Sequence, residues 1–355
     1  MEIFGKEPDN KLLGNYIVSY IGYSTDNHIR YNSSSGGMVT QILTFILDKG
    51  IIDGAIVTRM SDHDPLEAEP FIARTKEDVI EASKSKYCPV PVNVVLKEVL
   101  KSRSNERFAI VGLPCHIQGV RKAEVVNKVL RERIILHLGL FCGHAPTFSA
   151  TEFLLQKLNV KKEDVRRIHY RSEGWPGGLS VLLKNGTKVF IPFNSPYYWG
   201  LIFGQFFFTK RCSICADKLC ELADLSFGDA WLPELMYDKL GASFVIARSK
   251  RGERILREAL REGVIKLEKI SADKILQSQR TYIAKRRAKA RTSILNLFYR
   301  RIPCINHELP DPTQLDYLRA ILFYPLNHIM SKKSSRKLLD IYVKFARLFP
   351  ILSVV

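Results

Sequence analysis

Three cysteines in the second half of the chain are spaced as ligands of a metal or an iron–sulfur cluster. They lie between positions 211 and 220, where the chain reads RCSICADKLC. In the Cys-x-x-Cys pair Cys212 and Cys215, both thiolates lie on one tight turn, which suits zinc or one edge of a cluster. A structural zinc site usually has a second such pair or a Cys/His pair nearby, and none is present here. The spacing therefore indicates a cluster that takes further ligands from elsewhere.

Two other cysteines each follow an apolar run that predicts a buried β-strand. Cys115 follows RFAIVGLP, and Cys142 follows RIILHLGLF. In α/β sheets, sites collect at the carboxyl ends of the strands, so we expect both thiols at that edge. With Cys212 and Cys215 they make four thiolates, the number that a [4Fe–4S] cluster requires.

Alternatives to this ligand set remain open at the level of the residues. A lone cysteine at a strand end is more often a small buried hydrophobic residue than a ligand. We assign Cys88 and Cys304 to that class, whereas Cys220 could replace either single cysteine as the fourth ligand. The count of seven cysteines is odd and MEIFGKEPDNKLLG shows no apolar export signal, which argues against a disulfide framework and predicts a cytoplasmic location.

A serine- and glycine-rich stretch could bind an anion. Ser33–Gly37 (SSSGG) precedes a predicted helix, and backbone N–H groups at a helix start bind phosphate well. The stretch is neither a Walker A loop nor a G-x-G-x-x-G fingerprint, and an ordinary helix cap is the simpler interpretation. The segment 84–87 (KSKY) adds two cations and an aromatic ring, although a surface loop would explain it equally well.

Strands alternate with helices over the first 160 residues. We predict strands at Tyr16–Ile21, Asp53–Arg59, Phe71–Arg74, Arg107–Leu113 and Arg133–Phe141, and helices after Gly37 and at Thr75–Ser83, Asn93–Ser102, 114–126 and Thr147–Leu158. Further on, Asn185-Gly186 lies between two alternating runs and indicates a hairpin over Leu179–Phe193. Two more short strands are expected at Leu225–Gly228 and Ser243–Ala247.

These elements predict an α/β (α+β) protein with a mixed sheet and flanking helices. We divide the chain into an α/β domain at 1–160, an α+β domain at 161–275 that carries the Cys-x-x-Cys loop, and a basic helical tail at 276–355. The 355 residues are 46% apolar and 25% charged, an ordinary globular mix that excludes wholesale disorder.

The formal net charge is +18, and the segment from Arg280 onward carries +11 of it. Such a field favours anionic partners. The tail could lie on an anionic membrane surface, because Leu338, Leu339, Ile341, Tyr342, Phe345 and Leu348 fall near helical spacing. A helix that packs on its own domain is the simpler alternative. A nucleic-acid partner is not expected, since no RNA-binding signature accompanies the charge.

Taken together, the motifs resemble a known family. SSSGG, SKY, GLPCHIQGVR, GLFCGHAP and RCSICADKLCELADLSFGDAW occur here in the order seen in the beta subunits of coenzyme F420 hydrogenases and dehydrogenases. The resemblance covers residues 16–250. The Pro-Cys turn at 114–115 and the Cys-x-x-Cys segment followed by Ala-Asp and Gly-Asp-x-Trp are its most specific parts.

The resemblance implies an oxidoreductase that holds FAD and a [4Fe–4S] cluster and passes electrons between coenzyme F420 and a one-electron partner. The implied cluster ligands are Cys115, Cys142, Cys212 and Cys215, and the implied FAD contacts are Ser34, Ser35, Gly36 and Gly37, with Lys86 and Tyr87 near the flavin. Ferredoxin or other oxidoreductase subunits are the implied protein partners, because this chain has no cysteine before 88 and so lacks the N-terminal ferredoxin module of many relatives.

Two other functional classes stay open. Related sequences act on substrates other than F420, and some lie among polysaccharide-synthesis genes, so a ferredoxin-linked flavin reductase is one alternative. The other is a non-catalytic binding or assembly protein in which the cluster serves only to hold the fold together. A zinc-stabilised nucleic-acid binder is a more remote third interpretation.

Overall fold

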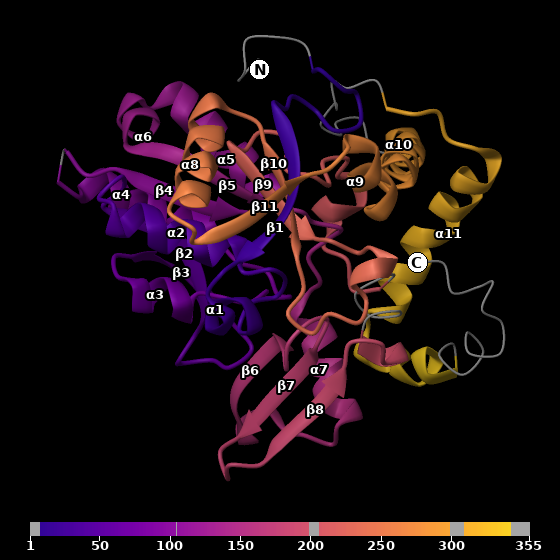
Figure 1. The fold of residues 1–355 in the computed structure, drawn as a ribbon. Coiled ribbons are helices and arrows are strands. Elements are labelled where there is room, and N and C mark those ends of the chain that lie inside the picture. The colour runs from indigo at the N-terminus through magenta and orange to yellow at the C-terminus, as the bar shows by residue number, and fades with distance from the viewer. Residues whose placement is uncertain (1–7, 104, 199–205, 299–308, 342–355) are drawn as a thin grey trace.

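The computed structural model describes residues 8–103, 105–198, 206–298 and 309–341. Its centre is an eight-stranded mixed sheet in the order β11-β1-β10-β9-β5-β4-β2-β3, and a three-stranded sheet, β6-β7-β8, lies below it in Figure 1. The strands are β1 (Val18–Ser24), β2 (Gly54–Met60), β3 (Ala68–Ala73), β4 (Phe108–Gly112), β5 (Ile134–Leu140), β6 (Val165–Ser172), β7 (Gly178–Leu183), β8 (Lys188–Pro192), β9 (Leu225–Asp229), β10 (Ser243–Ala247) and β11 (Ile265–Lys269). The predicted α/β (α+β) fold class with a mixed sheet is confirmed.

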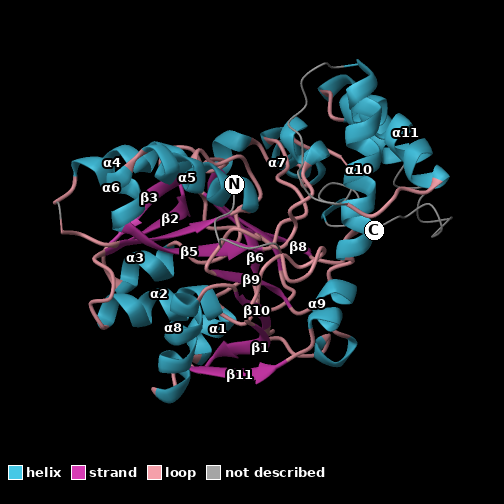
Figure 2. Ribbon diagram, turned by 90° about the horizontal axis from the view of Figure 1, so that it is seen from above, coloured by secondary structure: helices cyan, strands magenta, loops and turns pink. Residues whose placement is uncertain are grey.

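Helices flank the large sheet and continue beyond it. They are α1 (Asn27–Tyr31), α2 (Met38–Asp48), α3 (Lys76–Glu81), α4 (Leu96–Lys101), α5 (Pro114–Val126), α6 (Lys128–Arg133), α7 (Phe148–Lys157), α8 (Lys250–Arg261), α9 (Ala272–Ser278), α10 (Thr281–Phe298) and α11 (Gln314–Met330). Figure 2 shows α1, α2 and α8 on one side of the sheet and α4, α5 and α6 on the other.

The middle of the large sheet is parallel, which gathers several loops at one edge. Strands β2, β4, β5 and β9 run in the same direction, and β10 runs antiparallel to both β9 and β1. The carboxyl ends of β4, β5, β9 and β1 therefore meet at the edge where β10 begins. Sites in such sheets form at this edge. The segments that follow β1, β4 and β5 carry the predicted site residues Ser34–Gly37, Cys115 and Cys142, respectively.

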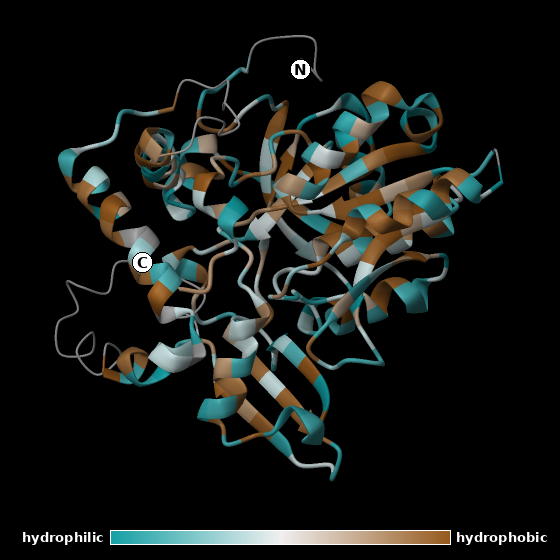
Figure 3. Ribbon diagram, turned by 180° about the vertical axis from the view of Figure 1, so that it is seen from behind, coloured by the Kyte–Doolittle hydropathy of each residue, from teal (hydrophilic) through white to brown (hydrophobic). Residues whose placement is uncertain are grey.

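Alternating side chains on the strands fill a core on each face of the sheet, because successive residues of a strand point to opposite sides. Ala55 and Val57 pack with α2 and α8, whereas Ile56 between them packs with α4, α5 and α6. Figure 3 shows apolar residues running along the strands of the large sheet. The amphipathic pattern after Gly37 correctly predicted α2, whose buried face includes Ile42 and Ile46.

The small sheet forms its own core with α7. The predicted hairpin is confirmed: β7 and β8 pair antiparallel, and Gly186 in the turn has a φ of +87°. Strand β6 was not predicted, because its sequence VRRIHYRS lacks a continuous apolar run. Strand β11 and helix α8 were not predicted either.

The predicted boundary at residue 160 does not separate the two sheets. Strands β9, β10 and β11 come from the segment 161–275, yet they complete the large sheet between and beside strands from the first 160 residues. Strand β9 pairs parallel with β5, and β10 then pairs antiparallel with β9 and β1, so the order of strands along the chain does not predict which sheet each one joins. The small sheet accounts only for residues 165–192 of that segment.

In its described residues, the basic C-terminal segment forms the helices α10 and α11, and α10 packs on the protein itself. Several of its cations are paired: Lys285 with Glu221, Arg286 and Arg287 with Asp316, and Lys289 with Asp311. Residues 336–341 are also helical, whereas Tyr342, Phe345 and Leu348 lie outside the described residues, as does Cys304. Among the described residues, no helix is both long and apolar enough to span a membrane. Contact of the tail with a membrane surface stays a prediction.

Candidate functional site

Three separate segments bring four cysteines into one neighbourhood. Cys115 lies in the first turn of α5, just after β4, and Cys142 lies two residues beyond the end of β5. Cys212 and Cys215 lie in and directly after a short 3₁₀ helix, Lys210–Ile214. The backbone N–H of Cys142 donates to the carbonyl of Lys218 at 2.9 Å, which ties the end of β5 to the loop after Cys-x-x-Cys.

The electrostatics of Cys142 indicate that the other three thiols lie near it. Burial raises the pKa of Cys142 well above the usual value of a thiol. The thiols of Cys212, Cys215 and Cys115 add to this rise, in that order. Since a like charge raises a thiol pKa only at short range, these four thiols lie in one neighbourhood, and their role as ligands stays a prediction.

Polar groups surround the sulfur of Cys212. The backbone N–H of Ala145 donates to its Sγ at 3.3 Å, and the hydroxyl of Thr209 donates at 2.9 Å. Hydrogen bonds of this kind stabilise a thiolate and tune the potential of a cluster that the thiolate binds. Cys115 has a further advantage, because the first turn of a helix favours negative charge.

Among the described residues, the four thiols do not form a site for a single metal ion. Within the described ranges, no group of three or more His, Cys, Asp or Glu side chains is arranged to hold one ion. A [4Fe–4S] cluster takes one thiolate per iron, so its ligands stand farther apart. In addition, Nε2 of His144, two positions after Cys142 in the chain, is buried and has no hydrogen-bond partner in the part of the chain that the structure describes. A buried nitrogen without a partner is unusual in a folded protein and fits a site built for a further group.

The remaining described cysteines belong to the apolar core. Cys220 is fully buried among Ile110, Ile117 and Ala223, and its Sγ lies against Gly139 of β5. Cys88 is buried as well. The burial of Cys88 agrees with its assignment to the small hydrophobic residues. Cys220, the alternative fourth ligand, lies in the core and also near the other thiols, because burial raises its pKa and the charges of Cys142 and Cys115 contribute to the rise.

The Ser/Gly stretch forms a tight loop between α1 and α2 at the carboxyl edge of the sheet. Ser34 Oγ accepts hydrogen bonds from the backbone N–H of Ser85 at 2.7 Å and from its hydroxyl at 3.0 Å. Ser35 Oγ donates to the carbonyl of Ala242 at 2.7 Å. The structure therefore joins SSSGG to the segment 84–87 and to the start of β10.

Backbone packing requires both glycines of this loop. A Cβ on Gly36 would lie 2.8 Å from the carbonyl oxygen of Gly22 and 2.9 Å from the backbone nitrogen of Ser243. Gly37 caps α2 with a φ of +76°, a left-handed conformation that side chains disfavour. These glycines bring the loop close to β1 and β10 whether or not a ligand binds.

Lys86 and Tyr87 have different roles in this arrangement. The ammonium of Lys86 donates to the carbonyls of Ala82, Ser83 and Lys84 at 2.5, 2.7 and 2.9 Å, which caps the end of α3. Burial lowers the pKa of Lys86 to about 7. The donors of Lys86 are thus occupied. Tyr87 instead accepts a hydrogen bond at its hydroxyl from Nη1 of Arg171, at 3.2 Å.

Arg171 on β6 is the central residue of this region, and no pattern in the sequence predicted it. Its Nη2 donates to the carbonyl of Ser34 at 2.7 Å and to Oδ2 of Asp229 at 2.8 Å. Burial disfavours the charge, but Asp229 and then Tyr87 hold the pKa of Arg171 above its ordinary value. Arg171 therefore links the small sheet to the Ser/Gly loop and to β9.

Aromatic rings cover this guanidinium. Phe193 and Trp231 lie 5.1 and 5.9 Å from its centre, and Trp231 is in turn 4.8 Å from Trp175. Trp175 Nε1 donates to Asp229 at 3.2 Å. The Gly-Asp-x-Trp motif thus supplies both the counter-ion of Arg171 and one of its covering rings.

A second buried charge network joins the cysteine-bearing segments. Both ring nitrogens of His137 face carboxylates: Nε2 lies 2.6 Å from Glu124 and Nδ1 3.0 Å from Asp224. Arg121 contacts the same two carboxylates at 3.4 and 3.3 Å. Glu124 belongs to α5 and His137 to β5, so the network connects the elements that hold Cys115 and Cys142 to the segment that follows Cys220.

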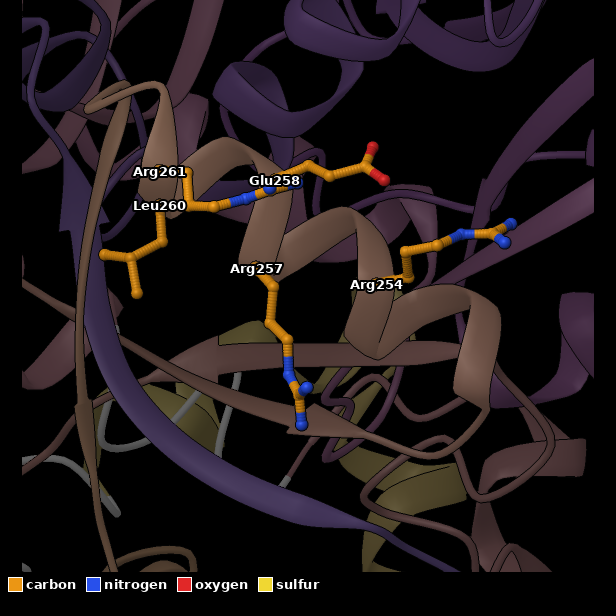
Figure 4. A pocket seen from close by; sticks show the side chains of 5 residues that line it. All are labelled: Arg254, Arg257, Glu258, Leu260 and Arg261. Atoms are coloured by element: carbon orange, nitrogen blue, oxygen red, sulfur yellow. The ribbon is translucent and has the colours of Figure 1, made fainter.

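Two surface hollows lie elsewhere, on α8. Arg254, Arg257, Glu258, Leu260 and Arg261 line the first, all from this one helix (Figure 4). The second lies between α8 and the end of α2. Neither hollow includes a predicted site residue.

The fold and the site place the chain in a known class. The family described as "Coenzyme F420 hydrogenase/dehydrogenase, beta subunit" matches with its N-terminal part over residues 19–97 and with its C-terminal part over residues 105–273. The chain therefore belongs to this family, and its class is that of the oxidoreductases. The predicted family and enzyme class are confirmed.

Individual relatives support the same class. The coenzyme F420 hydrogenase subunit beta of Methanothermobacter thermautotrophicus is 27% identical over 292 residues, which cover 78% of this chain and 97% of the relative. The coenzyme F420-dependent sulfite reductase of Methanocaldococcus jannaschii is 28% identical, over 69% of this chain and 38% of that protein. A chain of the F420-reducing [NiFe] hydrogenase complex from Methanosarcina barkeri has a similar fold, with a TM-score of 0.64, 24% identity, and coverage of 85% of this chain and 98% of that one.

Proposed function

We propose that the chain is an iron–sulfur flavoprotein that transfers electrons between coenzyme F420 and a one-electron partner protein. The observation that carries the proposal is the meeting of four cysteines from three segments at the carboxyl edge of β4 and β5. Family membership supports it, since relatives are named for F420-linked hydrogenase, formate dehydrogenase and sulfite reductase activities. The chemistry that bound FAD and a bound [4Fe–4S] cluster supply is conversion between two-electron and one-electron transfer.

The proposed cluster ligands are Cys115, Cys142, Cys212 and Cys215. Ala145 and Thr209 stabilise the thiolate of Cys212 through their hydrogen bonds to its sulfur. Burial, followed by the charge of Asp217, raises the pKa of Cys215 to about 12, so the iron ions of a bound cluster would have to displace its proton. The ligands thus gain their charge together with the group that they hold.

The proposed FAD contacts are Ser34, Ser35, Gly36 and Gly37, with Tyr87 beside the flavin. The start of α2 offers the positive end of a helix to a phosphate, and Gly36 and Gly37 keep the loop close to the sheet. Arg171 positions this loop through the Ser34 carbonyl. Lys86 acts by holding the end of α3 and thereby Tyr87, because its own donors are occupied.

The proposed partners are F420 and either a ferredoxin or further oxidoreductase subunits. Relatives carry the name of a beta subunit, and one solved relative belongs to a hydrogenase complex. The net charge of +18 favours both the anionic F420 and an acidic redox protein. A cytoplasmic location belongs to the same proposal.

The decisive experiment is anaerobic purification followed by a UV–visible spectrum, with flavin, iron and sulfide quantified and reduced F420 then added. We expect a flavin band and a broad cluster absorbance, both bleached by reduced F420. Flavin and cluster without a response to F420 would refute F420 as the substrate and leave a ferredoxin-linked reductase of another substrate. A colourless protein that contains zinc would overturn the proposal as a whole.

A further inference from the structure

The chain continues past the region that matches the family, and this continuation contacts the cysteine-bearing loop. The family match ends at residue 273, within α9, so α10 lies wholly beyond it. Nε of Arg291 on α10 donates to the carbonyl of Ser213 at 2.6 Å. Ser213 lies between the two cysteines of Cys-x-x-Cys, and it is 2% exposed. A residue outside the family match thus contacts the backbone of the proposed cluster loop.

Further contacts hold the same loop on its other side. Nζ of Lys285 pairs with Oε1 of Glu221 at 2.6 Å, and the side chain of Lys285 is 1% exposed. Lys218 donates through Nζ to the carbonyl of Gln279. The side-chain amide of Gln279 donates to the carbonyl of Asp229 at 2.8 Å. The segment from α9 to α10 therefore binds the stretch 213–229 at several points.

The stretch from Cys215 to Ala223 contains no helix or strand of its own. Such a stretch keeps its position only through contacts with its surroundings, and a cluster ligand must be held accurately. We propose that α10 completes the cluster site in this chain, with Arg291 as a positioning residue that fixes the Cys-x-x-Cys turn and places a positive charge beside the cluster. The inference rests on the proposed function, because it presupposes that Cys212 and Cys215 bind a cluster.

Other cations of α10 face away from this loop and provide a matched control. Arg286 and Arg287 contact Asp316 of α11, and Lys289 pairs with Asp311, whose side chain is 94% exposed. Lys289 lies two residues before Arg291 on the same helix. A Lys289→Ala variant therefore removes one positive charge from α10 without removing a contact to the cysteine loop.

The test compares the full chain with Arg291→Ala, Arg291→Lys and Lys289→Ala, all purified anaerobically. The measurements are iron content, the rate of iron loss to a ferrous chelator, and the midpoint potential of the cluster. We expect Arg291→Ala to lose iron roughly tenfold faster, as for loss of a charge-assisted hydrogen bond, and its potential to fall, because reduction adds negative charge that the cation stabilises. Arg291→Lys keeps the charge and a donor, so it should restore most of both properties.

Each possible result decides the proposal. Wild-type rates and potential in Arg291→Ala, or equal changes in Lys289→Ala, would overturn the role of α10 and leave the proposed function intact. A wild-type protein without iron would overturn both. If Arg291→Ala does not fold, Arg291→Lys still tests the positioning role of Arg291. A tenfold faster iron loss in Arg291→Lys would contradict that role, because this variant keeps the charge and a donor.

Discussion

Arg171 and Asp229 form a buried ion pair with an Nη2–Oδ2 distance of 2.8 Å, although 58 positions separate them and they belong to different sheets. The side chains are 3% and 18% exposed. The same nitrogen of Arg171 also donates to Ser34. One guanidinium thus fixes the small sheet, the carboxyl end of β9 and the proposed flavin loop relative to each other.

Removal of this guanidinium should lower both the free energy of unfolding and the flavin content of the protein. Arg171→Met leaves Asp229 without its cation, and loss of one partner of a buried pair costs about 3–5 kcal/mol. The free energy of unfolding in urea and the flavin content of the purified protein check this. Arg167→Met is the matched control on β6, because its pair with Asp62 is exposed and should matter by less than about 1 kcal/mol. Equal losses in the two variants would contradict the role of Arg171.

The glycine and serine positions of the loop should separate folding from flavin binding. Gly36→Ala should destabilise the protein, since its Cβ would lie 2.8–2.9 Å from backbone atoms of β1 and β10. Ser34→Ala keeps the backbone and leaves the N–H of Ser85 unpaired, a cost of about 1–3 kcal/mol, so its effect on flavin content is the cleaner test.

Thermal unfolding and flavin content of both variants are measured together. Gly119→Ala on α5 is the control, because its Cβ would enter open space, and alanine favours a helix by up to about 1 kcal/mol. A Gly36→Ala protein as stable as the Gly119→Ala protein would refute the packing argument.

We expect the cysteines to divide into cluster ligands and core residues, and iron content should distinguish the two groups. Cys212→Ser removes a proposed ligand whose sulfur accepts two hydrogen bonds, so the variant should lose most of its iron and sulfide. Cys220→Ala removes a buried sulfur that packs against Gly139, so it should lower the unfolding temperature and keep its iron. Full iron in Cys212→Ser, or iron loss in Cys220→Ala, would show that the ligand set is wrong.

Local patterns in the sequence predicted the part of the site that follows strands, and could not predict the part that depends on contacts between distant segments. Cys115 and Cys142 were found because apolar runs before them mark β4 and β5. Arg171 lies in VRRIHYRS, where three arginines suggest a surface strand, and only the fold shows which one is buried against Asp229. Likewise, His137 lies inside an apolar run, and its partners come from α5 and from the segment before β9.

The His137 network should be a major source of stability for the cysteine-bearing segments. Both ring nitrogens lie within hydrogen-bond distance of carboxylates. His137→Gln breaks these buried contacts, at an expected cost of about 1–3 kcal/mol for each buried group left without its partner. Urea denaturation measures this, with His28→Gln on the exposed surface of α1 as control. A loss below about 1 kcal/mol would show that the network contributes little.

His169 on β6 should give the protein an acid-sensitive stability. Burial, followed by the charges of Lys84 and Arg167, lowers the pKa of His169 to about 4 from an ordinary value of 6.5. Between these values the unfolded chain binds a proton that the folded protein does not, so His169 lowers the free energy of unfolding as the pH falls from 6.5 toward 4. The effect levels off below about 4, where both states are protonated.

A His169→Gln variant isolates this contribution, because glutamine stays neutral at every pH in the range. Urea denaturation of both proteins at pH 7.5 and at pH 5 gives the difference in their free energies of unfolding. Between pH 7.5 and pH 5, we expect the free energy of unfolding of the variant to rise relative to that of the wild type by on the order of 1–2 kcal/mol. The other acid-sensitive groups are common to both proteins and cancel in the comparison. Parallel stability curves would mean that the ring of His169 takes up its proton in the folded state as readily as in the unfolded chain, and that the basic residues around it do not exclude a further positive charge.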